Sequence, residues 1–178
     1  MDHTEVMLRS EEIYKGKIIR VRRDTVRLPN GKEAAREVVE HSGGVCILAL
    51  DETGCTYVVR QYRYAFETEL LELPAGKLEP GEDPAACAAR ELEEETGLRA
   101  EKLEYLGQIL PSPGFSREVL HAYLATGLSQ GKPRPDEDEF LTVRRLPLEA
   151  LYRMVLSGTV RDAKTVFAVL KAKALEEA

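Results

Sequence analysis

The sequence feature that most constrains the fold is the stretch Gly76–Leu98, GKLEPGEDPAACAARELEEETGL. Asp83 suits the cap position before a helix, and Pro84 suits the first helical position because that position leaves an N–H unpaired. Alanine-rich sequence follows, and Gly97 stands where a helix commonly ends in a left-handed residue. The stretch therefore predicts a loop followed by one helix between Asp83 and Gly97.

The predicted helix separates its side chains onto distinct faces. Glu91, Glu94 and Glu95 are spaced i, i+3, i+4 and therefore share one face. Arg90 lies one turn before Glu94 and can pair with it, whereas Glu93 falls outside this face and is expected to be solvated. An apolar stripe is expected to pack on a core and consists of Ala85, Ala88, Ala89 and Leu92.

Three carboxylates on one helix face repel one another, at roughly a few tenths of a kcal/mol per pair in water. A bound divalent cation would remove this cost. Oxygen ligands favour Mg²⁺ or Mn²⁺ over zinc, and magnesium is often bound by a few carboxylates together with substrate phosphates. The alternative is a solvated acidic face with Arg90 as its counter-ion.

The stretch also resembles the Nudix box, G-x5-E-x7-R-E-U-x-E-E-x-G-U, where U is a bulky aliphatic residue. Every fixed position of that pattern is matched, and a chance match at so many constrained positions is negligible in one protein. The matching residues are Gly76, Glu82, Arg90, Glu91, Leu92, Glu94, Glu95, Gly97 and Leu98.

This resemblance implies a Nudix hydrolase, which cleaves a nucleoside diphosphate linked to another moiety. It implies an α/β/α sandwich with a mixed sheet and about two or three bound Mg²⁺ or Mn²⁺ ions. The resemblance assigns metal binding to Glu91 and Glu95 and a catalytic or metal-bridging role to Glu94. It also implies that the Ala75 carbonyl is a further metal ligand. The other two charged positions of the box are expected to orient the loop and the carboxylates: Glu82 and Arg90.

Two segments before the box resemble the ADP-ribose pyrophosphatase branch of the family. Arg63 ends an R-Q-x-R segment, where the arginine of relatives approaches the substrate phosphates, a role that suits a planar guanidinium. The alternative is a surface salt bridge. Glu72 begins an intact ELPAG segment, and we expect a substrate-binding or structural role for it.

Two loops after the box carry further candidates. The S-P-G segment containing Pro113 and Gly114 predicts a tight loop whose backbone can approach a ligand. In this register it is typical of the same branch, so both residues are assigned to substrate binding. The acidic loop 131–139 can supply a catalytic glutamate in the family: we assign Glu137 as general base and Glu139 to catalysis and metal binding. A plain solvated acidic loop is the alternative.

The rest of the chain predicts an α+β order of elements. Residues 44–51, GVCILALD, are typical of a strand buried on both faces, and 56–63 is expected to return as its paired strand with Val58 and Val59 in the core. His121 is expected to be a strand-face residue. Further strands are expected at 103–110, 118–126 and 140–143, and helices at 148–156 and 160–175.

Residues 10–40 predict an N-terminal antiparallel unit whose strands flank the turn Pro29–Lys32. So thin a sheet is not expected to be stable alone. In the ADP-sugar branch this segment helps to form a homodimer and reaches the partner's site, so Arg36 is assigned to substrate binding. The expected domains are residues 1–42, the β extension, and 43–178, the Nudix domain. The alternative is an ordinary edge hairpin.

Composition narrows the class of function. The formal net charge of −6 argues against bulk nucleic-acid binding. The sequence has no run of 18 apolar residues, so no membrane span is predicted. The first residues are too polar for a signal peptide. Cys46, Cys55 and Cys87 lack metal-site spacing and are expected to be reduced thiols, so a cytoplasmic protein is predicted.

The reaction that the resemblance favours is hydrolysis of ADP-ribose to AMP and ribose 5-phosphate. Another nucleoside diphosphate sugar, such as ADP-glucose or GDP-mannose, is the alternative within the family. The chain has no Trp and so cannot contain the S-Q-P-W-P-F-P-x-S segment that points to NADH. A non-catalytic ADP-ribose sensor is disfavoured because every box glutamate is present, and a plain metal-binding helix would not need Gly76, Arg90 or Gly97.

Overall fold

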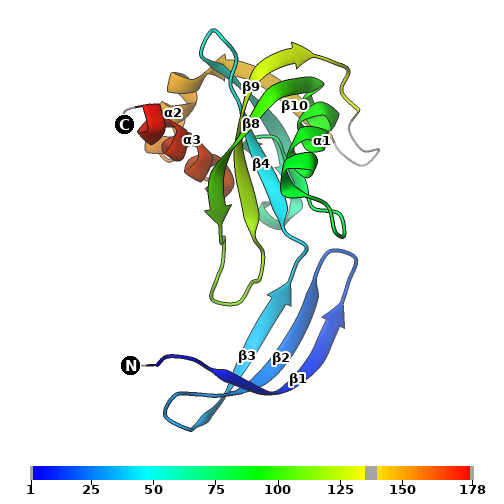
Figure 1. Cartoon of the computed structure of the whole chain (residues 1–178), viewed down its shortest axis with the longest axis vertical. Coiled ribbons are helices and arrows are strands. Elements are labelled where there is room, and N and C mark those ends of the chain that lie inside the picture. The colour runs from blue at the N-terminus through cyan, green and yellow to red at the C-terminus, as the bar shows by residue number, and fades with distance from the viewer. Residues whose placement is uncertain (1, 135–139, 177–178) are drawn as a thin grey trace. The chain divides into compact units, whose positions relative to one another are not determined.

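The computed structural model describes residues 2–134 and 140–176. These residues divide into two compact units, Met1–Gly43 with Leu110–Val119, and Gly44–Ile109 with Leu120–Ala178. The elements (Figure 1) are β1 (Val6–Lys15), β2 (Arg20–Arg27), β3 (Glu33–Glu40), β4 (Gly44–Ala49), β5 (Cys55–Arg63), η1 (Tyr64–Phe66), β6 (Thr68–Glu72), β7 (Ala75–Lys77), α1 (Pro84–Thr96), β8 (Leu98–Ile109), β9 (Leu120–Gln130), β10 (Leu141–Pro147), α2 (Leu148–Leu156) and α3 (Ala163–Glu176).

The N-terminal unit is an antiparallel sheet in the order β1-β2-β3, and β1 starts earlier than the sequence suggested. The turn between β2 and β3 closes because the Leu28 N–H donates to the Lys32 carbonyl at 2.8 Å. The segment Leu110–Val119 joins this unit, because the Val39 N–H donates to the Phe115 carbonyl at 2.8 Å. Every residue of β1 is exposed in the single chain.

The second unit is built around β4, whose six residues are all buried. β4 lies inside a four-stranded sheet of order β7-β4-β9-β8 and pairs in parallel only with β9, so the sheet is mixed. Its side chains alternate between two cores. Val45 and Ile47 pack with Ala88 and Leu92 of α1, whereas the intervening residues pack with α2 and α3.

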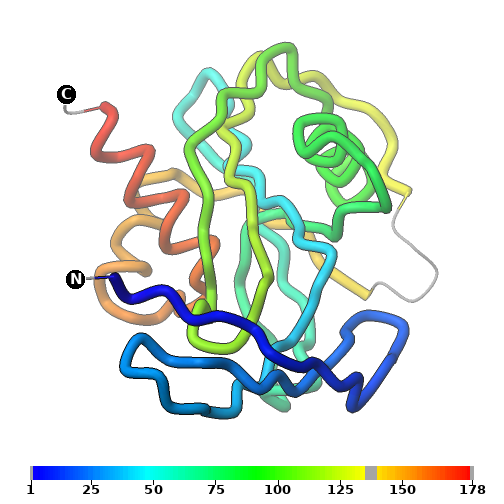
Figure 2. The backbone as a smooth tube through the Cα atoms, turned by 60° about the horizontal axis from the view of Figure 1, so that its bottom comes forward, coloured from blue at the N-terminus to red at the C-terminus, as the bar shows by residue number. Residues whose placement is uncertain are grey.

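The helices therefore cover opposite faces of the mixed sheet, with α1 on one side and α2 and α3 on the other (Figure 2). This arrangement confirms the α/β/α sandwich, of α+β class, that the sequence predicted. Among the described residues, none of the helices has the length and apolar character needed to cross a membrane.

The pairing expected for the second strand was wrong. β5 does not form a hairpin with β4 but joins a separate three-stranded antiparallel sheet of order β10-β5-β6. A strand has only two edges, and those of β4 are taken by β7 and β9. An isolated bridge between Leu50 and Thr56, with the Asp51 N–H donating to the Cys55 carbonyl at 2.9 Å, joins the ends of the two segments. Val58 and Val59 are nevertheless buried as expected.

The last helix starts at Ala163 instead of Val160. The reason is Asp162, whose carboxylate accepts the Thr165 N–H at 3.0 Å and so satisfies a donor of the first turn. The helix 148–156 was predicted with its observed bounds.

Candidate active site

Helix α1 forms as its capping residues predict. The Asp83 carboxylate accepts the N–H groups of Ala85 and Ala86 at 2.9 and 3.0 Å, and Gly97 ends the helix with φ of 72°. The buried face of α1 differs from the predicted apolar stripe in one position: Ala89 is exposed, and Cys87 is buried instead. Burial raises the pKa of the Cys87 thiol to about 12.

Arg90 organises the acidic face of α1. Its guanidinium donates to both carboxylate oxygens of Glu82, at 2.9 and 3.0 Å, and so ties the preceding loop to the helix. Its Nη1 donates to Glu91 at 2.8 Å and to Glu94 at 2.9 Å. The hydrogen bond from Arg90 lowers the pKa of Glu82 to about 2, and the bond to Glu82 raises the pKa of Arg90.

Glu91 and Glu95 lie one turn apart and are nearly buried, with 8% and 3% of their surface exposed. Glu95 accepts the Ala75 N–H at 3.1 Å, which brings β7 against the helix. Glu91 lies against Gly76, where a Cβ atom would stand 1.8 Å from the Glu91 Cδ. Any other residue at position 76 would displace the Glu91 carboxylate from this place, which gives a reason for the glycine.

Within residues 2–134 and 140–176, no group of three or more His, Cys, Asp or Glu side chains is arranged to hold a metal ion. In this structure Glu91 and Glu94 face Arg90, while Glu95 faces the Ala75 backbone. The donor set still fits a hard divalent cation, because two nearly buried carboxylates stand one helical turn apart on an element that fixes their spacing. Glu137 and Glu139 lie outside the described residues.

Glu93, expected to be solvated, is half-buried and pairs with Arg99 at 2.6 Å. This pair lies apart from the Arg90 cluster. Glu93 is therefore a matched control for substitutions of Glu94 and Glu95 on the same helix.

Arg63 and Glu72 form one bidentate pair between β5 and β6. The Arg63 Nε and Nη2 donate to the two carboxylate oxygens of Glu72, each at 2.7 Å. The Lys164 ammonium also donates to Glu72, and to Asp162 at 2.8 Å. Burial would raise the pKa of Glu72, but the bonds from Arg63 and Lys164 outweigh it and lower that pKa to about 2.

Sequence reasoning missed the contribution of α3 to this cluster. The sequence did carry a signal for it: Asp162 can cap a helix, and Lys164 and Thr165 follow at the start of an apolar helical pattern. A lysine at such a position can extend its side chain along the core. A cavity of about 320 Å³ lies beside the cluster and is lined by Arg63, Tyr64, Ala65, Phe66, Leu70, Glu72, Asp162 and Lys164.

The other predicted substrate residues belong to the N-terminal unit. Arg36 pairs with Glu5, with its Nε 2.9 Å from the carboxylate. Pro113 and Gly114 are exposed in a turn in which the Ser116 N–H donates to the Ser112 carbonyl at 2.9 Å.

His121 behaves as a strand-face residue, with its Nδ1 3.2 Å from the Tyr105 hydroxyl.

Comparison with known proteins agrees with this geometry. Residues 40–169 match the NUDIX domain, and residues 6–39 match the nucleoside diphosphate sugar hydrolase N-terminal domain. The chain is 44% identical to the ADP-ribose pyrophosphatase of Bacillus subtilis and 41% identical to the methanol dehydrogenase activator of Bacillus methanolicus. Each match covers 93% of this chain and 90% of the relative.

A solved structure described as an ADP compounds hydrolase has the same fold, with a TM-score of 0.86 and 22% identity over 97% of this chain and 94% of that one. The match to the family domain covers most of the chain and includes the helix that carries Glu91, Glu94 and Glu95. This chain therefore belongs to the Nudix hydrolase family.

Proposed function

We propose that this enzyme hydrolyses the pyrophosphate bond of ADP-ribose to give AMP and ribose 5-phosphate. The observation that carries the proposal is the set of box carboxylates gathered around Arg90 and Gly76. The 44% identity to a relative named ADP-ribose pyrophosphatase supports the choice of substrate.

Members of the family need a divalent metal, and we propose that about two or three Mg²⁺ ions, or Mn²⁺ in their place, are held here by Glu91, Glu94, Glu95, the Ala75 carbonyl and Glu139. Bound there, such an ion would neutralise pyrophosphate charge and lower the pKa of a coordinated water. Glu137 would accept a proton from the attacking water, and Glu94 would assist catalysis or bridge metal ions.

Arg63 would orient the substrate phosphates, since Glu72 fixes two of its donor groups while 39% of its side-chain surface stays exposed. Glu72 would act by holding Arg63. Pro113 and Gly114 are proposed to contact the substrate through their exposed turn.

The test is turnover with Mg²⁺ on ADP-ribose, ADP-glucose, GDP-mannose and NADH, using Glu94→Gln and Glu95→Gln beside Glu93→Gln as the matched control. We expect preference for ADP-ribose, a loss of at least roughly 100-fold in kcat in the first two variants, and near wild-type turnover in the control. Preference for another nucleotide sugar would keep the chemistry and refute the substrate. Equal losses in all three variants would refute the assignment of the site.

We further propose that residues 1–42 form a dimerisation and substrate-contact extension, with 43–178 as the catalytic domain. Support comes from β1, where five apolar side chains are between 43% and 57% exposed in the single chain: Val6, Met7, Leu8, Ile13 and Tyr14. A second copy of the chain would cover them, and Arg36 would contact substrate from this extension. The three free thiols suit a reducing compartment such as the cytoplasm.

Sedimentation velocity at micromolar concentration tests the assembly. We expect a dimer for the wild type, a monomer for Ile13→Glu, and a dimer for the control Glu11→Gln on the same strand. A wild-type monomer across the concentration range would refute the proposal.

A further inference from the structure

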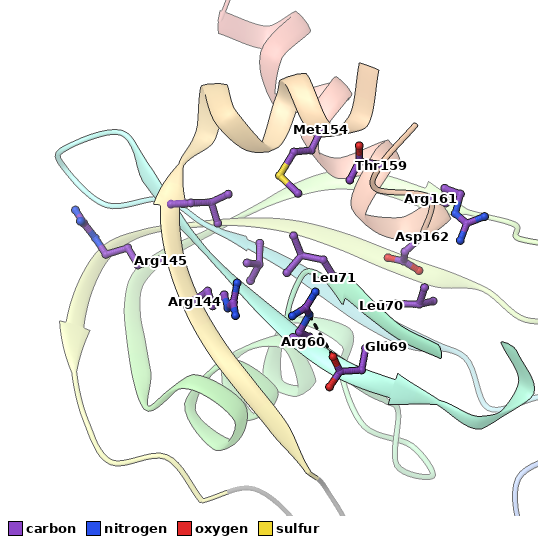
Figure 3. A pocket seen from close by; sticks show the side chains of 12 residues that line it. Arg60, Glu69, Leu70, Leu71, Arg144, Arg145, Met154, Thr159, Arg161 and Asp162 are labelled. Carbon is purple, nitrogen blue, oxygen red and sulfur yellow. Dashed lines mark ion pairs between the residues drawn. The ribbon is translucent and has the colours of Figure 1, made fainter. Parts of the chain in front are cut away.

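A second cavity, of about 440 Å³, lies on the three-stranded sheet β10-β5-β6 beneath the end of α2 (Figure 3). It draws its walls from strands β5, β6 and β10, from α2 and from the loop before α3. The residues that line it are Val58, Arg60, Glu69, Leu70, Leu71, Arg144, Arg145, Leu146, Met154, Thr159, Arg161 and Asp162.

This cavity opens on the sheet face opposite to Glu72. In an antiparallel sheet, directly paired residues share a face and successive residues alternate. Arg60 pairs with Leu71, and Val58 pairs with Arg144, so these side chains lie on one face. Val59 pairs with Glu72, which places Glu72 on the other face. The cavity is therefore distinct from the Arg63–Glu72 cluster, although Leu70 and Asp162 border both cavities.

The lining is basic in a chain whose net charge is −6. Of its four arginines, Arg145 pairs with Tyr57, so its side chain points to the other face of the sheet, where it donates to Asp51 at 2.7 Å. The other three stand against two carboxylates, and one of them, Arg60, lies 3.5 Å from Glu69. The guanidinium groups of Arg144 and Arg161 make no hydrogen bond or ion pair with another described residue. Both are exposed, so their guanidinium groups are open to a ligand.

Asp162 adds little negative charge to the cavity. Its carboxylate accepts the Thr165 hydroxyl at 2.6 Å and lies 2.8 Å from the Lys164 ammonium. The floor of the cavity is apolar and combines a few large side chains: Val58, Leu71, Leu146 and Met154.

We propose that this cavity binds a small phosphate monoester, with the phosphate held by Arg144 and Arg60 and the organic part resting on the apolar floor towards Arg161, which lies across the cavity in Figure 3. Guanidinium groups bind phosphate through charge-assisted hydrogen bonds, and the volume lies within the range of small-molecule sites. The ligand class includes nucleoside monophosphates and sugar phosphates. The proposal stands whether or not ADP-ribose is the substrate of the candidate active site.

The three methionines of the chain provide a local readout, because Met154 lines the cavity whereas Met7 lies in β1. The full chain would be labelled with ¹³C at the methionine methyl groups, and the signals assigned with Met7→Leu and Met154→Leu. AMP, ribose 5-phosphate, inorganic phosphate and adenosine would be titrated at constant ionic strength without divalent metal. We expect a saturable shift of the Met154 signal with one or both phosphate monoesters, a constant Met7 signal and no response to adenosine.

The double variant Arg144→Ala/Arg161→Ala is expected to weaken binding at least roughly tenfold, because charge-assisted hydrogen bonds are lost. The matched double variant Arg23→Ala/Arg99→Ala removes two exposed arginines elsewhere and should bind like the wild type. Relative response to AMP and to ribose 5-phosphate identifies which monoester the cavity takes, and a response to inorganic phosphate alone overturns the assignment of an organic ligand.

Two other results would overturn the proposal. One is a Met154 signal that does not move, or that moves equally in the Arg144→Ala/Arg161→Ala variant. The other is a shift that Arg63→Ala abolishes while Arg144→Ala/Arg161→Ala retains it, because the ligand would then occupy the candidate active site.

Discussion

Gly76 shows how one missing side chain fixes the position of a carboxylate. A Cβ at this position would overlap the end of Glu91, which is flexible and can move aside. We predict that Gly76→Ala displaces the Glu91 carboxylate and weakens Mn²⁺ binding on the order of 10- to 100-fold, with little change in Tm. Electron paramagnetic resonance titration and thermal unfolding measure the two effects. Unchanged Mn²⁺ affinity would contradict the role given to Glu91.

The cysteines differ in predicted reactivity. Burial raises the pKa of both Cys46 and Cys87 to about 12, and the thiolate is the reactive form. Cys55 is only half-buried. We predict that a thiol reagent at neutral pH modifies Cys55 in the native protein and the other two only on unfolding. The variant Cys55→Ser should show no native-state modification, and one that still reacts would disprove the assignment.

At the scale of elements, the start of α3 holds the segment between β6 and β7 that leads into the box. The Thr165 hydroxyl accepts the Leu73 N–H at 2.9 Å and donates to Asp162 at 2.6 Å, with both Thr165 and Leu73 fully buried. We predict that Thr165→Val lowers the free energy of unfolding by about 1–3 kcal/mol, because the Leu73 N–H loses its partner. Thr165→Ser keeps the hydroxyl and should lose less in urea denaturation. Equal losses would mean that packing, not this bond, is responsible.

Elements whose ends carry local signals were predictable from sequence. Asp83 and Pro84 determine where α1 begins, because Asp83 accepts free N–H groups of the first turn and Pro84 has no N–H to satisfy. Gly97 determines where the helix ends, because it adopts the left-handed conformation. The shared face of the box glutamates follows from helix geometry. The partners of β5 were not predictable, because pairing depends on strands distant in sequence that compete for the same edges. The hydrogen bond from the Leu73 N–H to the Thr165 hydroxyl was missed for the same reason.

At the scale of the whole molecule, carboxylates with lowered pKa values make stability depend on pH, and Asp51 and Glu93 share this property with Glu72 and Glu82. The folded-state pKa values of Glu72 and Glu82 are both depressed to about 2 from an ordinary 4.5. The contribution of these two carboxylates to the free energy of unfolding is therefore fully present above about pH 4.5 and is lost as the pH falls towards about 2. We predict a falling free energy of unfolding across this window, measured by urea denaturation at a series of pH values.

The double variant Glu72→Gln/Glu82→Gln should reduce that dependence and leave the part that comes from Asp51 and Glu93, whereas Glu52→Gln, an exposed carboxylate in a turn, should leave it unchanged. A dependence as steep in the double variant as in the wild type would assign the pH-sensitive groups to other residues.

The parallel pairing of β4 with β9 has a consequence for biosynthesis. As the chain leaves the ribosome, β1, β2 and β3 emerge complete, and each finds its partner in the adjacent segment. β4 must wait for β9, which is synthesised only after the whole box has appeared. Helix α1 thus emerges before one edge of its supporting strand is covered, so the nascent chain exposes the unpaired backbone edge of an apolar strand during that interval.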